Sequence, residues 1–184
     1  MHNRKILIIG EVYVDQHLDI IENGYSTSRL GGIFHAARSC DALNIEYALA
    51  YYAPDYLVKD VEKFGIDVLR ASSIFRLGKV DKAPNVMLIG QSDESGNQLY
   101  ENILGRQAEY VSMLPFMQVL DDFDPTDIII FPGRYGNAGI LSNLSNYEGK
   151  IHIDMNYDCD DILDLDTIKI QPAFLLSLIH ISEP

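Results

Sequence analysis

The chain has 184 residues, of which 47% are hydrophobic and 22% are charged, which fits one globular domain and argues against disorder. Its 14 Lys and Arg against 27 Asp and Glu give a formal net charge of −13, which argues against nucleic acid or an anionic membrane as partner. No apolar run approaches the roughly 20 residues of a membrane-spanning helix. Cys40 and Cys159 lie far apart, so we expect no disulfide framework and a cytoplasmic location.

Apolar runs that alternate with helical patterns organise the first half of the chain. The expected elements are a strand at 6–9, a helix at 34–43, a strand at 47–53, a helix at 56–64 and a strand at 66–69. Asp55 is expected to cap the second helix and Gly65 to stop it. Buried strands separated by helices predict an α/β fold with a mostly parallel sheet and right-handed crossovers.

The middle of the chain has a different pattern. Short strands are expected at 74–77, 85–90 and 98–103, and the turn-rich loop at 92–97 predicts a hairpin. We expect these strands to form an edge flap or lid outside the parallel sheet. Alternation then returns, with a helix at 112–120, a strand at 127–131, a helix at 138–144, a strand at 150–154 and a short acidic helix at 160–165.

Ligands of open α/β sheets bind beyond the carboxyl ends of the strands, where this chain places carboxylates and glycines. After the first strand a dinucleotide site would need G-x-G-x-x-G, but the sequence has Glu11 and Asp15, which repel phosphate and accept hydrogen bonds from hydroxyls. Gly31 and Gly32 precede the first helix and allow close approach of a ligand to the backbone. The alternatives are solvated carboxylates and a plain tight turn.

Other polar residues near strand ends give weaker signals. Arg134, in the strand-end segment 131–136, suits an anionic or hydroxylated ligand, and the alternative is a surface arginine. His35 is more typical of a packed or capping histidine than of a catalytic base. His152 and Asp154 share one strand face, but no third ligand is spaced to complete a metal site. The acidic segment that starts at Asn156 lacks the glycine and glutamate of a calcium loop.

Taken together, these residues resemble the ribokinase-like (PfkB-type) carbohydrate kinase family over residues 4–174. The resemblance rests on Gly10 and Asp15, the Gly31-Gly32 turn, the Ala53-Pro54-Asp55 helix start, the mid-chain hairpin and the D-P-N-x-R-like segment at 154–157. It implies a three-layer α/β/α sheet, mostly parallel, with a small β-lid at 12–30 and 74–104. Residues 1–175 would be the N-terminal portion of such a kinase domain.

The resemblance also implies a reaction, the transfer of the ATP γ-phosphoryl group to a sugar or nucleoside hydroxyl with Mg²⁺. It assigns Asp15, Gly31 and Gly32 to the substrate, to which we add His35 and Arg134 as candidates. Asp154 and Asn156 are expected on the phosphate and metal side, and no residue is assigned as a metal ligand. The catalytic aspartate belongs to a C-terminal motif, D-T-x-G-A-G-D, that this sequence lacks. A homodimer could pair through the lid.

We interpret the last nine residues of the sequence as having a different origin from the rest of the chain. Residues 176–184 resemble a translated transposase sequencing adapter, so we expect an artefactual tail on an inactive fragment whose C-terminal part is missing. One alternative is a non-catalytic sugar-binding or regulatory protein, favoured by Asp158, which stands where the family usually has arginine, and by His35 in the altered Gly-Gly segment. The other is a Rossmann-type oxidoreductase, disfavoured because the glycine fingerprint is absent.

Overall fold

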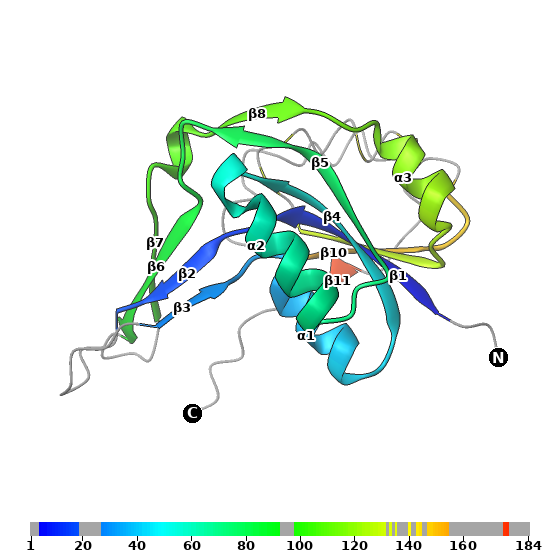
Figure 1. The fold of residues 1–184 in the computed structure, drawn as a ribbon, viewed down its shortest axis with the longest axis horizontal. Coiled ribbons are helices and arrows are strands. Elements are labelled where there is room, and N and C mark those ends of the chain that lie inside the picture. The colour runs from blue at the N-terminus through cyan, green and yellow to red at the C-terminus, as the bar shows by residue number, and fades with distance from the viewer. Residues whose placement is uncertain are drawn as a thin grey trace.

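The larger of two β-sheets forms the centre of the molecule (Figure 1). The computed structural model describes residues 4–18, 27–92, 98–131, 133, 135, 140, 143–144, 147–154 and 175–176. The larger sheet has the order β11-β10-β9-β1-β4-β5-β8, and only β8 is antiparallel to its neighbour. Its strands are β1 (Lys5–Glu11), β4 (Glu46–Ala53), β5 (Ser73–Asp81), β8 (Glu109–Ser112), β9 (Asp127–Ile130), β10 (Lys150–Asp154) and β11 (Leu175–Leu176).

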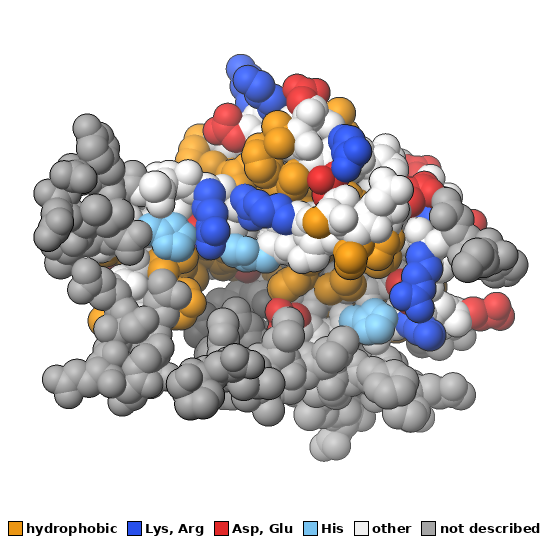
Figure 2. Space-filling model, turned by 90° about the horizontal axis from the view of Figure 1, so that it is seen from below, with side chains coloured by type: hydrophobic (Ala, Val, Ile, Leu, Met, Phe, Trp, Pro, Cys, Tyr) orange, Lys and Arg blue, Asp and Glu red, His pale blue; other side chains and the backbone are white. Residues whose placement is uncertain are grey.

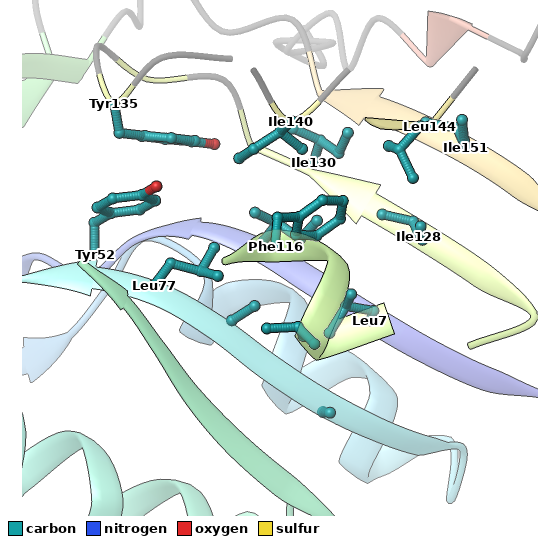
Figure 3. Packing of buried hydrophobic residues seen from close by; sticks show 14 of the residues in the cluster. Leu7, Tyr52, Leu77, Phe116, Ile128, Ile130, Tyr135, Ile140, Leu144 and Ile151 are labelled. Carbon is teal, nitrogen blue, oxygen red and sulfur yellow. The ribbon is translucent and has the colours of Figure 1, made fainter. Parts of the chain in front are cut away.

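Helices cover both faces of this sheet, because successive strand residues point to opposite sides. Ile6 and Ile8 of β1 pack in one core cluster with buried residues of α1 (Phe34–Ala42) and α2 (Val58–Lys63). Leu7 and Ile9 pack in the other cluster with buried residues of α3 (Phe116–Phe123), as Figure 3 shows for Leu7 and Phe116. The expected three-layer α/β/α architecture with a mostly parallel sheet is therefore confirmed.

A second sheet projects beyond the carboxyl end of β1 (Figure 1) and is called the lid below. Its order is β3-β2-β6-β7, formed by β3 (Thr27–Leu30), β2 (Val14–His17), β6 (Val86–Ser92) and β7 (Gln98–Asn102). β6 and β7 are antiparallel, so the expected hairpin is present. Of the lid range expected at 74–104, the part that includes β6 and β7 lies in this sheet. The prediction is wrong for residues 74–81, because β5 pairs with β4 and buries Leu77 and Val80 in the main core.

The segment expected as a strand at 66–69 is instead a π-helical turn, Phe64–Val68, that continues α2. Gly65 therefore does not stop the helix, and the exposed Ile66 and Val68 face solvent, where a core strand would have buried them. Asp55 caps no helix with its side chain. It pairs with Lys79 at 2.8 Å and Arg76 at 2.6 Å, and these hydrogen bonds hold the pKa of its carboxyl below the usual range.

The expected helix at 112–120 begins later than its pattern suggested. β8 occupies residues 109–112, and α3 starts only after Pro115, which has an extended backbone. The helix expected at 138–144 lies mostly outside the described residues, and the helix expected at 160–165 lies entirely outside them. The expected tail at 176–184 also lies outside them, apart from Leu176, which pairs with Asp154. Among the described helices, none combines the length and the apolar character needed to cross a membrane.

Candidate functional site

Asp15 lies on β2 of the lid and is only 4% exposed. Its partner across the antiparallel β2–β3 pair is Arg29, whose Nε lies 3.7 Å from Oδ2 of the aspartate. Nε2 of His35 lies 3.0 Å from the same oxygen. Three side chains from β2, β3 and α1 thus meet at the base of the lid, and Asp15 is the buried member of this group.

The Gly31-Gly32 turn brings the chain from β3 into α1 directly beneath Asp15. A Cβ on residue 31 would stand 2.1 Å from Oδ1 of Asp15, and one on residue 32 would stand 2.1 Å from the carbonyl oxygen of Glu11. Gly32 also has a φ of +62°, in the left-handed region that glycine occupies without cost. Glycine is therefore required at both positions, because the Asp15 carboxylate and the Glu11 carbonyl oxygen occupy the space that a side chain would need.

His35 occupies the first turn of α1 with a half-exposed side chain. It is neither a packed core residue nor an N-cap, because Ile33 precedes the helix and no side chain caps it. The helix is held to the turn by the backbone hydrogen bond from His35 N to Gly32 O, 3.1 Å long. This placement aims the imidazole at Asp15.

The geometry leaves one oxygen of Asp15 available. Both polar contacts of the carboxylate end on Oδ2, and within the described part of the chain no hydrogen bond reaches Oδ1. A carboxylate oxygen accepts hydrogen bonds only, so a hydroxyl group is a suitable partner for Oδ1. The neighbouring Arg29 and His35 offset the cost of keeping the negative charge buried.

Glu11 is a second buried carboxylate, 6% exposed, that the sequence analysis treated mainly as a solvated side chain. It accepts hydrogen bonds from the hydroxyls of Tyr13 and Tyr110, both 2.9 Å long, and from the amide of Asn85 at 3.2 Å. Burial, and then the charge of Glu11, raise the pKa of Tyr13 far above its usual value. Because Asn85 immediately precedes β6, Glu11 ties the lid to the carboxyl end of β1.

A cluster of three tyrosine rings lies beside Glu11. The rings of Tyr52 and Tyr135 stack on each other, as Figure 3 shows. Their centroids are 4.7 Å apart and their planes differ by 20°, and the ring of Tyr110 meets both edge-on. A Cβ on Gly133 would lie 2.5 Å from Oε1 of Glu11, so the chain after β9 passes close to this carboxylate. Packed aromatic rings therefore lie next to the polar residues between the large sheet and the lid.

Arg29 was not predicted as a site residue, and Glu11 was predicted only as an acceptor of hydrogen bonds from hydroxyls, with a solvated side chain as the alternative. A signal for Arg29 was available only with the strand register, because residues 15 and 29 face each other once Val14 pairs with Leu30. The burial of Glu11 could have been predicted from its position, because Glu11 directly follows Gly10 in an apolar strand that is buried on both faces.

The expected phosphate and metal side is described only in part. Asp154 ends β10 and is half-buried, whereas Asn156 and Arg134 lie outside the described residues. His152 lies near Asp127, with 3.7 Å between Nε2 and Oδ1. Among the described residues, no three His, Cys, Asp or Glu side chains come together as a metal site.

The geometry can be compared with known proteins. No protein-family model matches the sequence, and no curated protein matches it. Solved structures do match. A ribokinase from Giardia lamblia superposes with a TM-score of 0.60 at 16% identity, covering 90% of this chain and 58% of that one. The chain has the ribokinase fold.

Other structures with the ribokinase fold agree. The Arabidopsis thaliana ribokinase complexed with ribose and ATP gives a TM-score of 0.58 at 10% identity and covers 83% of this chain and 54% of that one. A PfkB family carbohydrate kinase from Listeria grayi gives 0.57 at 13% identity, covering 90% and 55%. The chain thus spans little more than half the length of these kinases.

Proposed function

We propose that this chain forms the substrate-binding portion of an ATP-dependent carbohydrate kinase. The observation that carries the proposal is the buried Asp15, held by Arg29 and His35 with its Oδ1 available, at the base of a lid. Such a carboxylate binds and orients a sugar or nucleoside hydroxyl. The ribokinase fold of the described residues supports the same class of substrate, because the ribokinase of Arabidopsis thaliana was solved with ribose and ATP.

Each candidate residue has a role in this proposal. Asp15 accepts a hydrogen bond from a substrate hydroxyl and His35 holds Asp15 in position. Gly31 and Gly32 contribute to the substrate site by leaving room for the Asp15 carboxylate and the Glu11 carbonyl group. Arg134 contributes to the substrate side, and the phosphate side lies at the carboxyl end of β10.

ATP with Mg²⁺ supplies the phosphoryl group in the proposed reaction. Asp154 and Asn156 would lie toward the phosphates. The catalytic base and the anion-binding glycines would lie in the part of these kinases that this chain does not match, so phosphoryl transfer requires that part. We expect the protein to work in the cytoplasm.

Titration calorimetry tests the proposed binding with ribose, fructose, adenosine and NADH as probes. We expect at least one sugar or nucleoside to bind and Asp15→Asn to weaken it at least about tenfold, because a charge-assisted hydrogen bond becomes a neutral one. Asp121→Asn is the matched control, since Asp121 is exposed on α3, on the other face of the large sheet. Binding of NADH alone, or equal losses in the two variants, would overturn the proposal.

Phosphoryl transfer is tested separately with a chain extended to kinase length. ADP release is followed after this chain is mixed with ATP, Mg²⁺ and the sugar that binds in the calorimetry. Transfer that Asp15→Asn slows supports the kinase. Sugar binding with no transfer by the extended chain would instead identify a non-catalytic sugar-binding protein on the same fold.

We also propose that two copies of the chain pair through their lids. β7 forms one edge of the lid and exposes 61% of Leu99, and Leu104 beyond it is 52% exposed. Exposed strand edges with apolar side chains favour pairing with another strand. Light scattering should give the mass of a dimer for the wild type and of a monomer for Leu99→Glu; a wild-type monomer would contradict the pairing.

A further inference from the structure

A hollow of about 360 Å³ lies between the lid strand β3 and the helices α1 and α2. Asp15, Gly31 and His35 do not line this hollow. Arg29, which pairs with Asp15, does line it. Its charged lining consists of Arg29 from β3, Arg38 from α1, and Asp60 and Lys63 from α2. Three cations against one carboxylate thus surround one hollow in a chain whose net charge is −13.

Arg38 is the most constrained of these cations. Its Nη2 donates a hydrogen bond to the carbonyl oxygen of Leu30 at 2.7 Å, and its guanidinium lies 5.5 Å from the centre of the Phe64 ring. Its Nη1 is buried and, within the described residues, has no hydrogen-bond partner. A buried donor without a partner is costly. A small shift of the guanidinium toward the hollow would let a ligand oxygen accept a hydrogen bond from Nη1 and remove that cost.

Arg29 and Arg38 also repel each other. Burial, followed by the charge of Arg29, lowers the pKa of the Arg38 guanidinium. Figure 2 shows Lys and Arg side chains beside histidine on one face of the molecule. An anion placed between like charges of this kind relieves their repulsion, and guanidinium groups bind phosphate oxygens in a two-pronged geometry.

We propose that this hollow binds a phosphate group. The three cations and Asp60 together give the lining a net charge of +2, which matches the double negative charge of phosphate better than the single charge of a carboxylate. The group could be a free phosphate ion or part of a phosphorylated sugar, and both present the same oxygens. Arg29 connects the hollow with the candidate sugar site, because its Nε lies 3.7 Å from Asp15.

The test is titration calorimetry at low ionic strength with inorganic phosphate, ribose 5-phosphate and ribose. We expect inorganic phosphate or ribose 5-phosphate to bind, with Arg38→Gln weakening the binding at least about tenfold. Lys63→Gln should weaken it about threefold, since Lys63 is exposed. Lys59→Gln is the matched control, because Lys59 is exposed on α2, does not line the hollow and carries the same charge.

The relative affinities identify the source of the group. Ribose 5-phosphate that binds more tightly than both phosphate and ribose assigns the hollow to a phosphorylated sugar, and equal affinities assign it to free phosphate. Binding of neither phosphate compound would overturn the proposal. So would equal losses in Lys63→Gln and Lys59→Gln, a comparison that stands even if Arg38→Gln does not fold.

This proposal does not depend on the proposed kinase function. Asp15→Asn should weaken the binding of neutral ribose at least about tenfold, whereas inorganic phosphate should still bind. If the wild type binds phosphate but no sugar, the proposed kinase function is contradicted and the proposed phosphate site is supported. If it binds a sugar but neither phosphate compound, only the proposed phosphate site is contradicted.

Discussion

The carboxylate of Asp15 lies directly against the Cα of Gly31, so closely that a Cβ there would be 2.1 Å from Oδ1 and 2.3 Å from Cγ. The two residues are 16 positions apart in sequence and meet because β2 and β3 pair antiparallel, with Val14 opposite Leu30. The missing side chain at position 31 is therefore what allows Asp15 to be buried at the base of the lid.

Gly31→Ala should displace Asp15. Because the added methyl group overlaps the carboxylate, we expect the free energy of unfolding to fall by about 1–3 kcal/mol and sugar binding to be lost. Urea denaturation and calorimetry measure the two effects. Gly90→Ala is the control, since its added Cβ would meet nothing nearer than the Cβ of Leu99 at 3.3 Å. Full binding by Gly31→Ala would show that Asp15 does not contact the sugar.

Gly32→Ala should destabilise the chain for a different reason. The backbone at this position has a φ of +62°, which costs an alanine about 1–2 kcal/mol, and the new Cβ would also overlap the carbonyl oxygen of Glu11. We expect thermal denaturation to show a larger fall in the melting temperature for Gly32→Ala than for Gly90→Ala. Equal melting temperatures for the two variants would mean that the turn relaxes freely.

Glu11→Gln should loosen the attachment of the lid. The amide nitrogen that replaces one carboxylate oxygen cannot accept the hydrogen bonds from Tyr13 or Tyr110, so we expect a loss of about 1–3 kcal/mol. Amide hydrogen exchange should become faster in β2 and β6, which Glu11 and Asn85 hold to the main sheet. Glu62→Gln, on the exposed surface of α2, should change neither quantity. Unchanged exchange in Glu11→Gln would contradict this role.

The buried tyrosines should make the fold sensitive to alkali. Burial raises the pKa of Tyr47 and of Tyr51 from 10.0 to about 12. Between these values the unfolded chain loses protons that the folded chain retains. The contribution of these two groups to the free energy of unfolding is therefore constant below about pH 10. Above it the contribution falls by about 1.4 kcal/mol per pH unit for each group, up to about pH 12.

Two substitutions separate this titration from hydrogen bonding. Tyr51→Phe removes a buried hydroxyl that has no partner within the described residues, so it should raise stability near neutral pH by about 1 kcal/mol. Tyr47→Phe loses the hydrogen bond to the carbonyl oxygen of Leu69 and should lower it by about as much. Urea denaturation across the alkaline range should show a shallower decline for both variants, and an unchanged decline would contradict the assignment.

Much of the architecture follows from the sequence because strand and helix periodicities are local properties. The apolar run in β1, the helix that starts at Phe34 and the hairpin of β6 and β7 were all predicted. The prediction failed at Phe64–Val68, where an apolar pattern forms a π-helical turn, and it did not foresee β8, whose four residues are largely exposed. Short segments of this kind take their structure from neighbours distant in sequence.

The sequence by itself determined that Asp15 follows a buried strand and that two glycines precede a helix, since both are patterns of adjacent residues. Only the tertiary structure decided which groups meet there. The pairing of β2 with β3 brings Arg29 to Asp15, α1 adds His35, and the path of β6 and β8 encloses Glu11 with Asn85 and Tyr110. These contacts depend on strand register and crossover geometry, which no local pattern specifies.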